Sequence, residues 1–171
     1  LPGKMLYEIA GKPMLQYVIE RVQQCDSLEN LVVATSSECC DDDLEVFCKQ
    51  FGVACFRGHL LNVACRFKDL LEAYSFDGFV RVSGDSPLID PNIVDRAIDN
   101  YSSTECDYLT NSLQRTFPYG TEIEIFTFSA LQTAWKYAKK NSEREHVTPY
   151  FYNNPEKFKI CHFLFIGDDR N

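Results

Sequence analysis

The sequence predicts an α/β domain in which a largely parallel sheet carries helices on both faces. Two observations support this fold class. Short apolar strand patterns alternate with amphipathic helix patterns through the first hundred residues, and the connections between them are only a few residues long. With 171 residues, of which 45% are hydrophobic, the chain is long enough to bury the core of a single domain.

The first elements are a helix, a strand and a second helix. Residues 11–13 should open the first helix, which ends near Cys25, because proline suits a first helical position. The apolar run 31–35 suits a strand that is covered on both faces. Three aspartates at 41–43 suit the solvated first turn of a helix that stops at Gly52, and a metal-binding acidic cluster is the alternative.

The central strand, residues 79–82, is the element on which the functional prediction depends. It follows a strand at 53–56 and a helix at 63–74, and it ends at Ser83-Gly84, so Asp85 should lie at its carboxyl end. Ligands of open α/β sheets gather at that edge, where a carboxylate can hold Mg²⁺ against nucleotide phosphates. The alternative is that this glycine, aspartate, serine and proline form only a turn.

The remaining elements are shorter and less regular. A helix capped by Asp90-Pro91 precedes a strand at 107–111 and an alternating strand that begins at Glu122. A helix begins at Ser129. The spacing of Ser142 and Glu145 is that of a capping box, which places His146 in the first or second turn of another helix. Residues 158–165 should form a last strand or edge.

Composition excludes several classes of protein. A net charge of −8 and a pI near 4.9 argue against a nucleic-acid surface. No apolar run reaches the roughly 18 to 20 residues that span a bilayer, so we expect a soluble, cytoplasmic protein with no membrane partner. The chain has eight cysteines but no C-x-x-C pair, which disfavours a zinc site and favours reduced thiols. The alternative is that these cysteines form the disulfides of a secreted protein.

Six motifs occur in order along the chain. They are Leu1-Pro2-Gly3-Lys4, Ala10-Gly11-Lys12-Pro13-Met14, Val32-Val33-Ala34-Thr35-Ser36, Phe56-Arg57-Gly58, Ser83-Gly84-Asp85-Ser86-Pro87-Leu88-Ile89-Asp90 and Arg144-Glu145-His146-Val147-Thr148-Pro149. Together they resemble the cytidylyltransferase family of spore coat polysaccharide biosynthesis proteins, which is related to the acylneuraminate and 3-deoxy-manno-octulosonate cytidylyltransferases. The resemblance runs from residue 1 to about residue 160.

The resemblance implies a Rossmann-like nucleotidyltransferase fold of the glycosyltransferase-A type, a three-layer sandwich with a mostly parallel mixed sheet. It also implies transfer of CMP from CTP to a sugar, expected to be acidic, with release of pyrophosphate, for cell-surface polysaccharide biosynthesis. Such chemistry uses a divalent cation, here Mg²⁺, and a cationic group on the phosphates. The partners would be CTP and a small sugar. Because the second half is rich in aromatic residues, at 122–128 and 151–165, we also expect a homodimer.

Site residues follow from the motifs and from the expected strand ends. Lys4 and Asp85 are the candidate catalytic residues, and Asp85 is the candidate metal ligand. The candidate nucleotide-binding residues are Leu1, Gly3, Lys4, Thr35, Ser36, Arg57, Gly58 and Ser83. The candidate sugar-binding residues are Arg115, Gly120, Glu122, Arg144 and His146. As alternatives, Lys4 could be an exposed lysine, the two sugar-site arginines could form surface ion pairs, and His146 could satisfy a neighbouring carbonyl.

Two departures from the family pattern concern the ends of the sequence. Family members begin with a strand and a loop bearing Arg, Ser and a second Arg, and they continue into a segment whose aspartate is the expected second metal ligand. We therefore expect residues 1–171 to be one nucleotidyltransferase domain that lacks its first strand and phosphate loop upstream and a short segment downstream. A metal-dependent glycosyltransferase is disfavoured, since no second acid lies two residues after Asp85. A non-catalytic nucleotide-binding remnant of the fold is the other alternative.

Overall fold

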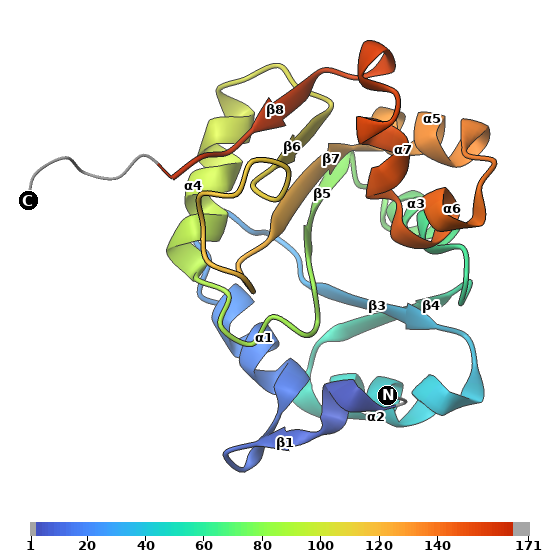
Figure 1. Cartoon of the computed structure of the whole chain (residues 1–171). Coiled ribbons are helices and arrows are strands. Elements are labelled where there is room, and N and C mark those ends of the chain that lie inside the picture. Colours follow the sequence, from blue (N-terminus) through green and yellow to red (C-terminus); the bar gives the residue numbers. More distant parts are fainter. Residues whose placement is uncertain (1–2, 166–171) are drawn as a thin grey trace, which may run out of the picture.

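A computed structural model describes residues 3–165 of the chain (Figure 1). The helices are η1 (Lys4–Leu6), α1 (Met14–Val22), η2 (Cys39–Asp41), α2 (Asp42–Phe51), α3 (Val63–Tyr74), α4 (Pro91–Ser102), α5 (Phe128–Tyr137), α6 (Asn141–His146), α7 (Thr148–Tyr152) and η3 (Pro155–Lys157). The strands are β1 (Glu8–Ile9), β2 (Lys12–Pro13), β3 (Val32–Ser36), β4 (Ala54–Gly58), β5 (Gly78–Val82), β6 (Tyr108–Thr110), β7 (Ile123–Thr127) and β8 (Ile160–His162).

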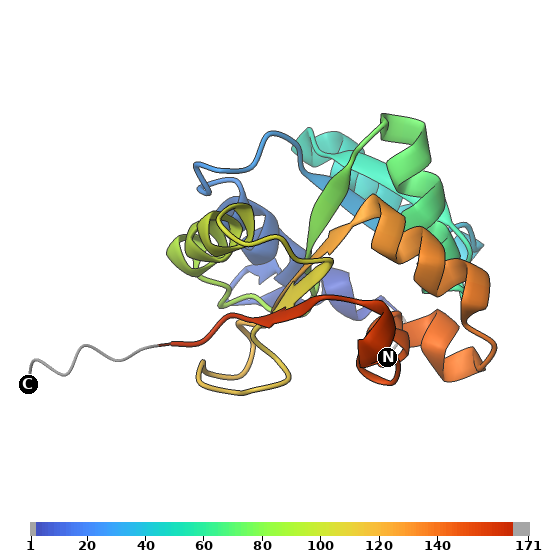
Figure 2. The same ribbon diagram turned by 90° about the horizontal axis from the view of Figure 1, so that it is seen from above.

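The elements form three layers, as the fold class predicted. Figures 1 and 2 show strands between two groups of helices. One core cluster joins buried residues of α1, α2 and α4 to one face of the strands, and a second joins α3, α5 and α7 to the other. The α/β sandwich is therefore confirmed, with burial of both strand faces supplying its main stabilisation.

The sheet is mixed and is interrupted in the middle. Strands β3 and β4 pair in parallel, whereas the other large sheet has the order β5-β7-β6-β8, with β7 antiparallel to both of its neighbours. Within residues 3–165 no ladder joins β3 to β5. Both faces of β3 are covered as predicted, since Val33 packs against one core cluster and Val32 and Ala34 against the other. These three residues stay half-buried because the edge of β3 that faces β5 is unpaired.

Local departures from the predicted elements have identifiable causes. The first helix begins at Met14, because a hairpin of β1 and β2 precedes it and turns through Ala10 and Gly11, both at positive φ. The capping box expected from Ser142 is wrong, since α6 begins at Asn141 and Glu143 accepts the backbone N–H groups of residues 139 and 140. His146 is consequently the last residue of α6 and not part of its first turn.

Two predictions about helix ends hold. Asp90 caps α4 by accepting a 3.0 Å hydrogen bond from the backbone of Asn92, with proline at the first helical position. Gly52 ends α2 at φ 72°, a left-handed conformation that favours glycine. No helix in the described part of the chain has the length and apolar composition needed to cross a membrane. All eight cysteines are free thiols.

Candidate active site

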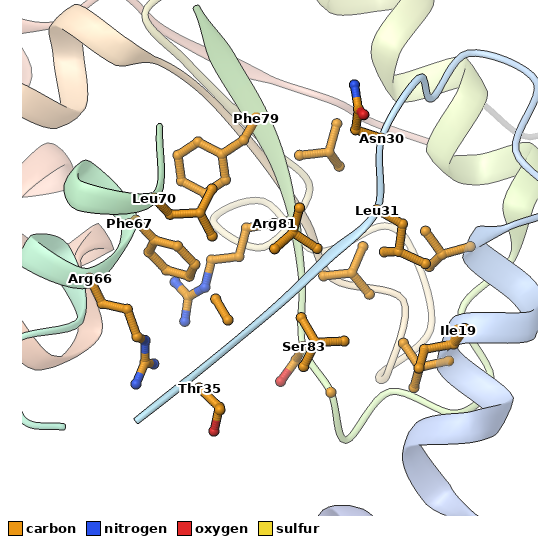
Figure 3. Close-up of a pocket in the computed structure, with 18 of the residues that line it drawn as sticks. Ile19, Asn30, Leu31, Thr35, Arg66, Phe67, Leu70, Phe79, Arg81 and Ser83 are labelled. Carbon is orange, nitrogen blue, oxygen red and sulfur yellow. The ribbon is translucent and has the colours of Figure 1, made fainter. Parts of the chain in front are cut away.

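A cavity of about 1240 Å³ lies between β3 and β5 and extends along both strands to their carboxyl ends. Its floor is apolar, with side chains from β3, β5, α1 and α3 (Figure 3). Polar groups gather at the carboxyl ends, where Thr35 lies near the end of β3 and Ser83 follows β5, and Gly3 and Lys4 also line this region. Four of the predicted site residues therefore meet at one edge of the strands. Leu1 lies outside the described residues.

Lys4 and Asp85 contact each other across 81 positions of sequence. The Lys4 ammonium lies 2.5 Å from Asp85 Oδ2, and Ser83 Oγ donates to the other carboxylate oxygen. Hydrogen bonds from Lys4 first, and then from Ser83, lower the pKa of Asp85 below its usual value. Asp85 is therefore an ionised carboxylate beside a primary amine at the carboxyl end of β5. Both side chains stay about two-fifths exposed, so a ligand can reach them.

Gly84 lets the N-terminal segment come close to the turn after β5. A Cβ atom at position 84 would lie 3.1 Å from the sulfur of Met5 and 3.4 Å from its methyl carbon. Gly3, at φ 70°, turns the chain into η1, and Met5 then packs over Gly84. Two glycines thus position Lys4 against Asp85.

Thr35 and Ser36 are buried and hydrogen bonded to one carboxylate. Asp41 Oδ2 accepts from Thr35 Oγ1 at 2.7 Å, from the backbone N–H of Ser36 at 3.0 Å and from the Ser36 hydroxyl. Burial opposes ionisation, but the bonds from Ser36 and Thr35 lower the pKa of Asp41. The first of the three consecutive aspartates therefore fixes the end of β3.

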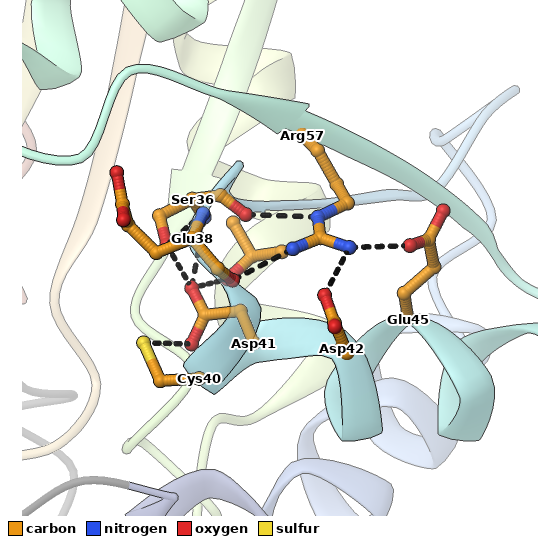
Figure 4. A network of polar contacts seen from close by, with 8 residues as sticks. Ser36, Glu38, Cys40, Asp41, Asp42, Glu45 and Arg57 are labelled. Atoms are coloured by element: carbon orange, nitrogen blue, oxygen red, sulfur yellow. Dashed lines mark hydrogen bonds and ion pairs between the residues drawn. The ribbon is translucent and has the colours of Figure 1, made fainter.

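Arg57 turns toward α2 and is not among the residues that line the cavity. Its Nη1 lies 2.7 Å from both Asp42 and Glu45, while Nε and Nη2 donate to the carbonyls of Ser36 and Glu38 (Figure 4). The guanidinium thus holds the loop after β3 against α2. Its contact with nucleotide stays a prediction, and Arg57 already has partners within the protein.

Gly58 ends β4 beside the side chain of Arg66. A Cβ at position 58 would lie 2.8 Å from Arg66 Cγ and 3.2 Å from Arg66 Cβ. The absence of a side chain at Gly58 therefore leaves room for Arg66, which the sequence motifs do not single out. The signal that could have found it is the helical spacing of Arg66 within α3 beside apolar Phe67 and Leu70.

The predicted sugar loop supplies a cluster at the same edge. Arg115 Nη1 lies 2.8 Å from Glu122 Oε1, and the backbone N–H of Gly120 donates to Glu122 Oε2 at 2.9 Å. Although burial opposes ionisation, the bond from Arg115 and the backbone donors lower the pKa of Glu122. Ile123 pairs with Val82, so Glu122 lies beside the carboxyl end of β5. Arg115, Gly120 and Glu122 are thus brought together.

Arg144 and His146 lie farther along, on α6. Arg144 Nε donates to the carbonyl of Ala138 at 3.1 Å, which ties α6 to the end of α5. The His146 carbonyl accepts from Arg81 at 3.3 Å, and its side chain is exposed. Neither residue lines the cavity, although their neighbour Glu145 does. Val147, buried and at φ 64°, forms a strained link between α6 and α7.

A buried charged network that the sequence did not reveal lies beneath this edge. Glu124 pairs with Arg81 at 2.9 Å and accepts a 2.7 Å hydrogen bond from the Tyr108 hydroxyl. Burial raises the pKa of Glu124, and the two partners offset this only in part. The Glu124 carboxylate is enclosed by Arg81 and Tyr108, which reach it from the two strands that flank β7.

The residues at this edge are compatible with a cation whose ligands come largely from a bound substrate. Within residues 3–165 no group of three or more histidine, cysteine or acidic side chains could hold a metal ion. Asp85 offers a carboxylate at the carboxyl end of β5. Mg²⁺ is commonly bound by one or two carboxylates together with phosphate oxygens and water, so one carboxylate is a compatible donor set.

Comparison with known proteins decides the family. The sequence profile described as Cytidylyltransferase matches residues 1–168. The chain belongs to the cytidylyltransferase family. A cytidylyltransferase structure from Leptospira borgpetersenii serovar Hardjo-bovis is 38% identical, with a TM-score of 0.92 over 99% of this chain and 72% of that one. The family predicted from the motifs is therefore confirmed.

Two curated relatives extend this result. The spore coat polysaccharide biosynthesis protein SpsF of Bacillus subtilis is 32% identical over 94% of this cytidylyltransferase chain and 68% of its own length. The 3-deoxy-manno-octulosonate cytidylyltransferase 1 of Actinobacillus pleuropneumoniae serotype 5b is 29% identical over 98% of this chain and 63% of its own length. The chain thus spans about two thirds of the length of these relatives.

Proposed function

We propose that the full-length protein transfers CMP from CTP to a sugar and releases pyrophosphate. The observation that carries this proposal is the contact between Lys4 and Asp85 at the carboxyl end of β5, in a chain of the cytidylyltransferase family. An amine and a carboxylate side by side suit a substrate that is both polyanionic and accompanied by a cation. The likeness to SpsF, a spore coat polysaccharide biosynthesis protein, supports a role in polysaccharide biosynthesis.

The chain's own residues would divide the work. A sugar hydroxyl attacks the α-phosphorus, a new phosphorus–oxygen bond forms, and the bond to pyrophosphate breaks. The Lys4 ammonium would leave Asp85 and take up charge on the phosphates, which frees the Asp85 carboxylate for Mg²⁺. When bound, Mg²⁺ would withdraw charge from the phosphate oxygens and orient them. A second carboxylate ligand is proposed to come from the segment downstream.

The sugar is placed beside the Arg115 loop. Arg115 and Glu122 lie at the end of β7 that adjoins the carboxyl end of β5, within the loop that the resemblance assigned to the acceptor. A guanidinium can bind a carboxylate through two parallel hydrogen bonds, so Arg115 suits an acidic sugar. Arg144 and His146 are proposed to bind the same substrate from α6.

The assay for this function is pyrophosphate release from CTP and Mg²⁺ with a panel of acidic sugars. The proposal expects release that depends on one sugar, on CTP and on the divalent cation. Calorimetry with CTP separates the alternatives. A non-catalytic remnant would bind CTP without turnover, whereas a protein that neither binds CTP nor releases pyrophosphate would refute the proposal.

We also propose that an upstream segment of the same polypeptide fills the gap between β3 and β5. Each strand is paired along one edge only within the described part of the chain, and the cavity between them has an apolar floor. Gly3 and Lys4 line the cavity near Ser83, so a segment leading into them would run parallel to both strands. An inserted strand would satisfy two rows of backbone groups along the facing edges.

Hydrogen exchange tests the upstream segment. In the full-length protein, amides of β3 and β5 should exchange more slowly than in residues 1–171 alone. Amides of β6 serve as the internal control, because β6 is already paired on both sides by β7 and β8. Equal exchange rates of the β3 and β5 amides in the two proteins would refute the proposal that an upstream segment fills the gap.

A cytoplasmic homodimer completes the proposal. Eight free thiols and a CTP substrate both suit a reducing cytoplasm. Of the two aromatic-rich segments, 122–128 contains β7, which is interior to its sheet, whereas 151–165 contains the edge strand β8, with Leu164 and Phe165 exposed beyond it. Pairing of two β8 edges would cover them. Sedimentation that shows only monomer at micromolar concentration would exclude this dimer.

A further inference from the structure

Arg66 is a cavity-lining cation for which the described residues supply no partner. Its side chain extends from α3 toward Thr35 at the open end of β3 (Figure 3). The Nε atom is buried and without a hydrogen bond, and no ion pair involves this guanidinium within residues 3–165. The other two cations of the lining are neutralised, Lys4 by Asp85 and Arg81 by Glu124. Arg66 therefore differs from both.

The fold holds the stem of Arg66 closely. Because a Cβ at Gly58 would approach within 2.8 Å of Arg66 Cγ, any other residue at position 58 would displace the arginine. Phe67 follows Arg66 on the same helix and packs with its ring centroid 5.0 Å from that of Phe79 of β5, which anchors α3 against the sheet. The guanidinium is thus directed at the end of the cavity where the predicted nucleotide-binding residues gather.

The chemistry of guanidinium determines what can bind there. Burial is the main cause that lowers the pKa of Arg66, while Asp41 attracts and Arg81 repels its charge. Arginine stays protonated in proteins, so a guanidinium whose Nε is buried is stabilised by an oxygen acceptor and not by loss of a proton. A buried donor without a partner costs free energy that such a ligand would recover.

We propose that Arg66 binds the cytidine nucleotide through an oxygen acceptor, either a phosphate oxygen or the carbonyl oxygen of the base. The inference deepens the proposed function and rests on it. Arg66 would replace Arg57 as the arginine that serves the nucleotide, since Arg57 is engaged by Asp42 and Glu45. It lies beside Gly58, where β4 ends, and lines the same cavity as Thr35 near the end of β3.

The test is calorimetry on the full-length protein with CTP, CMP and cytidine, comparing wild type with Arg66→Met. Methionine keeps an unbranched stem and removes every donor. Charge-assisted hydrogen bonds are worth about 1.5–3 kcal/mol, so Kd for CTP should rise roughly 10- to 150-fold. Arg96→Met is the matched control, because Arg96 is exposed on α4 and should leave Kd unchanged. Arg66→Lys keeps the positive charge and loses the planar pair of donors, so its Kd for CTP should lie between those of wild type and Arg66→Met.

The outcomes separate this inference from the proposed function. If wild type fails to bind CTP, the proposed function is refuted, and the inference about Arg66 is refuted with it. If wild type binds CTP and Arg66→Met and Arg66→Lys bind it equally well, only the Arg66 inference is overturned. A lower Tm with unchanged Kd would also overturn it, because the partner would then lie within the protein. Weakening with cytidine as well as CTP assigns the base carbonyl, whereas weakening with CMP and CTP alone assigns phosphate.

Discussion

Replacing Asp85 with asparagine removes the negative charge at the end of β5 and keeps the shape of the side chain. The Lys4–Asp85 pair is about two-fifths exposed on each side, and exposed ion pairs contribute about 0–1 kcal/mol to stability. For a domain of this size, a loss of about 1 kcal/mol lowers Tm by roughly 2–4 °C. Asp85→Asn should therefore fold almost normally.

Turnover should respond far more strongly than stability. A metal contact that stabilises charge in the transition state is worth several kcal/mol, and about 1.4 kcal/mol corresponds to a tenfold change in rate. We therefore expect kcat in pyrophosphate release to fall at least about 100-fold, with weaker Mg²⁺-dependent binding of CTP.

Two results would contradict this reasoning. Turnover within a few-fold of wild type would remove Asp85 from the metal site. A Tm that falls by much more than about 4 °C would show that the carboxylate supports the fold, since an exposed pair cannot account for so large a loss. Asp99→Asn on α4 is the control, because Asp99 is an exposed helical aspartate outside the described site.

Three further predictions address other parts of the site. Tyr108→Phe removes the 2.7 Å donor to buried Glu124 and should lower the free energy of unfolding by about 1–3 kcal/mol, measured by urea denaturation with Leu109→Met as a packing control. Arg115→Lys should raise KM for the sugar strongly while KM for CTP changes little; the opposite result would move Arg115 to the nucleotide site. The free energy of unfolding should fall as the pH drops below about 4. The pKa of Asp41 is lowered in the folded protein, so the unfolded state binds a proton more readily in this pH range. Asp41→Asn should therefore make the free energy of unfolding less dependent on pH.

The sequence alone determined most elements and the position of the reacting edge. Strand and helix periods, the Asp90 cap and the turn at Ser83-Gly84 act through backbone preferences over a few residues. These preferences place Asp85 at the end of β5 without any contribution from distant segments. They missed the hairpin at Ala10-Gly11, because alanine at φ 50° is not a typical turn residue.

The partners of each charged side chain were decided only by the tertiary structure. Arg57 and Arg66 lie nine positions apart, yet one is held by the acids of α2 and the other is left facing the cavity. Glu124 meets Arg81 and Tyr108 because β7 inserts between β5 and β6, an order that no local pattern specifies. Strand order and helix placement depend on contacts between distant segments, so the electrostatic environment of a side chain emerges only when those segments meet.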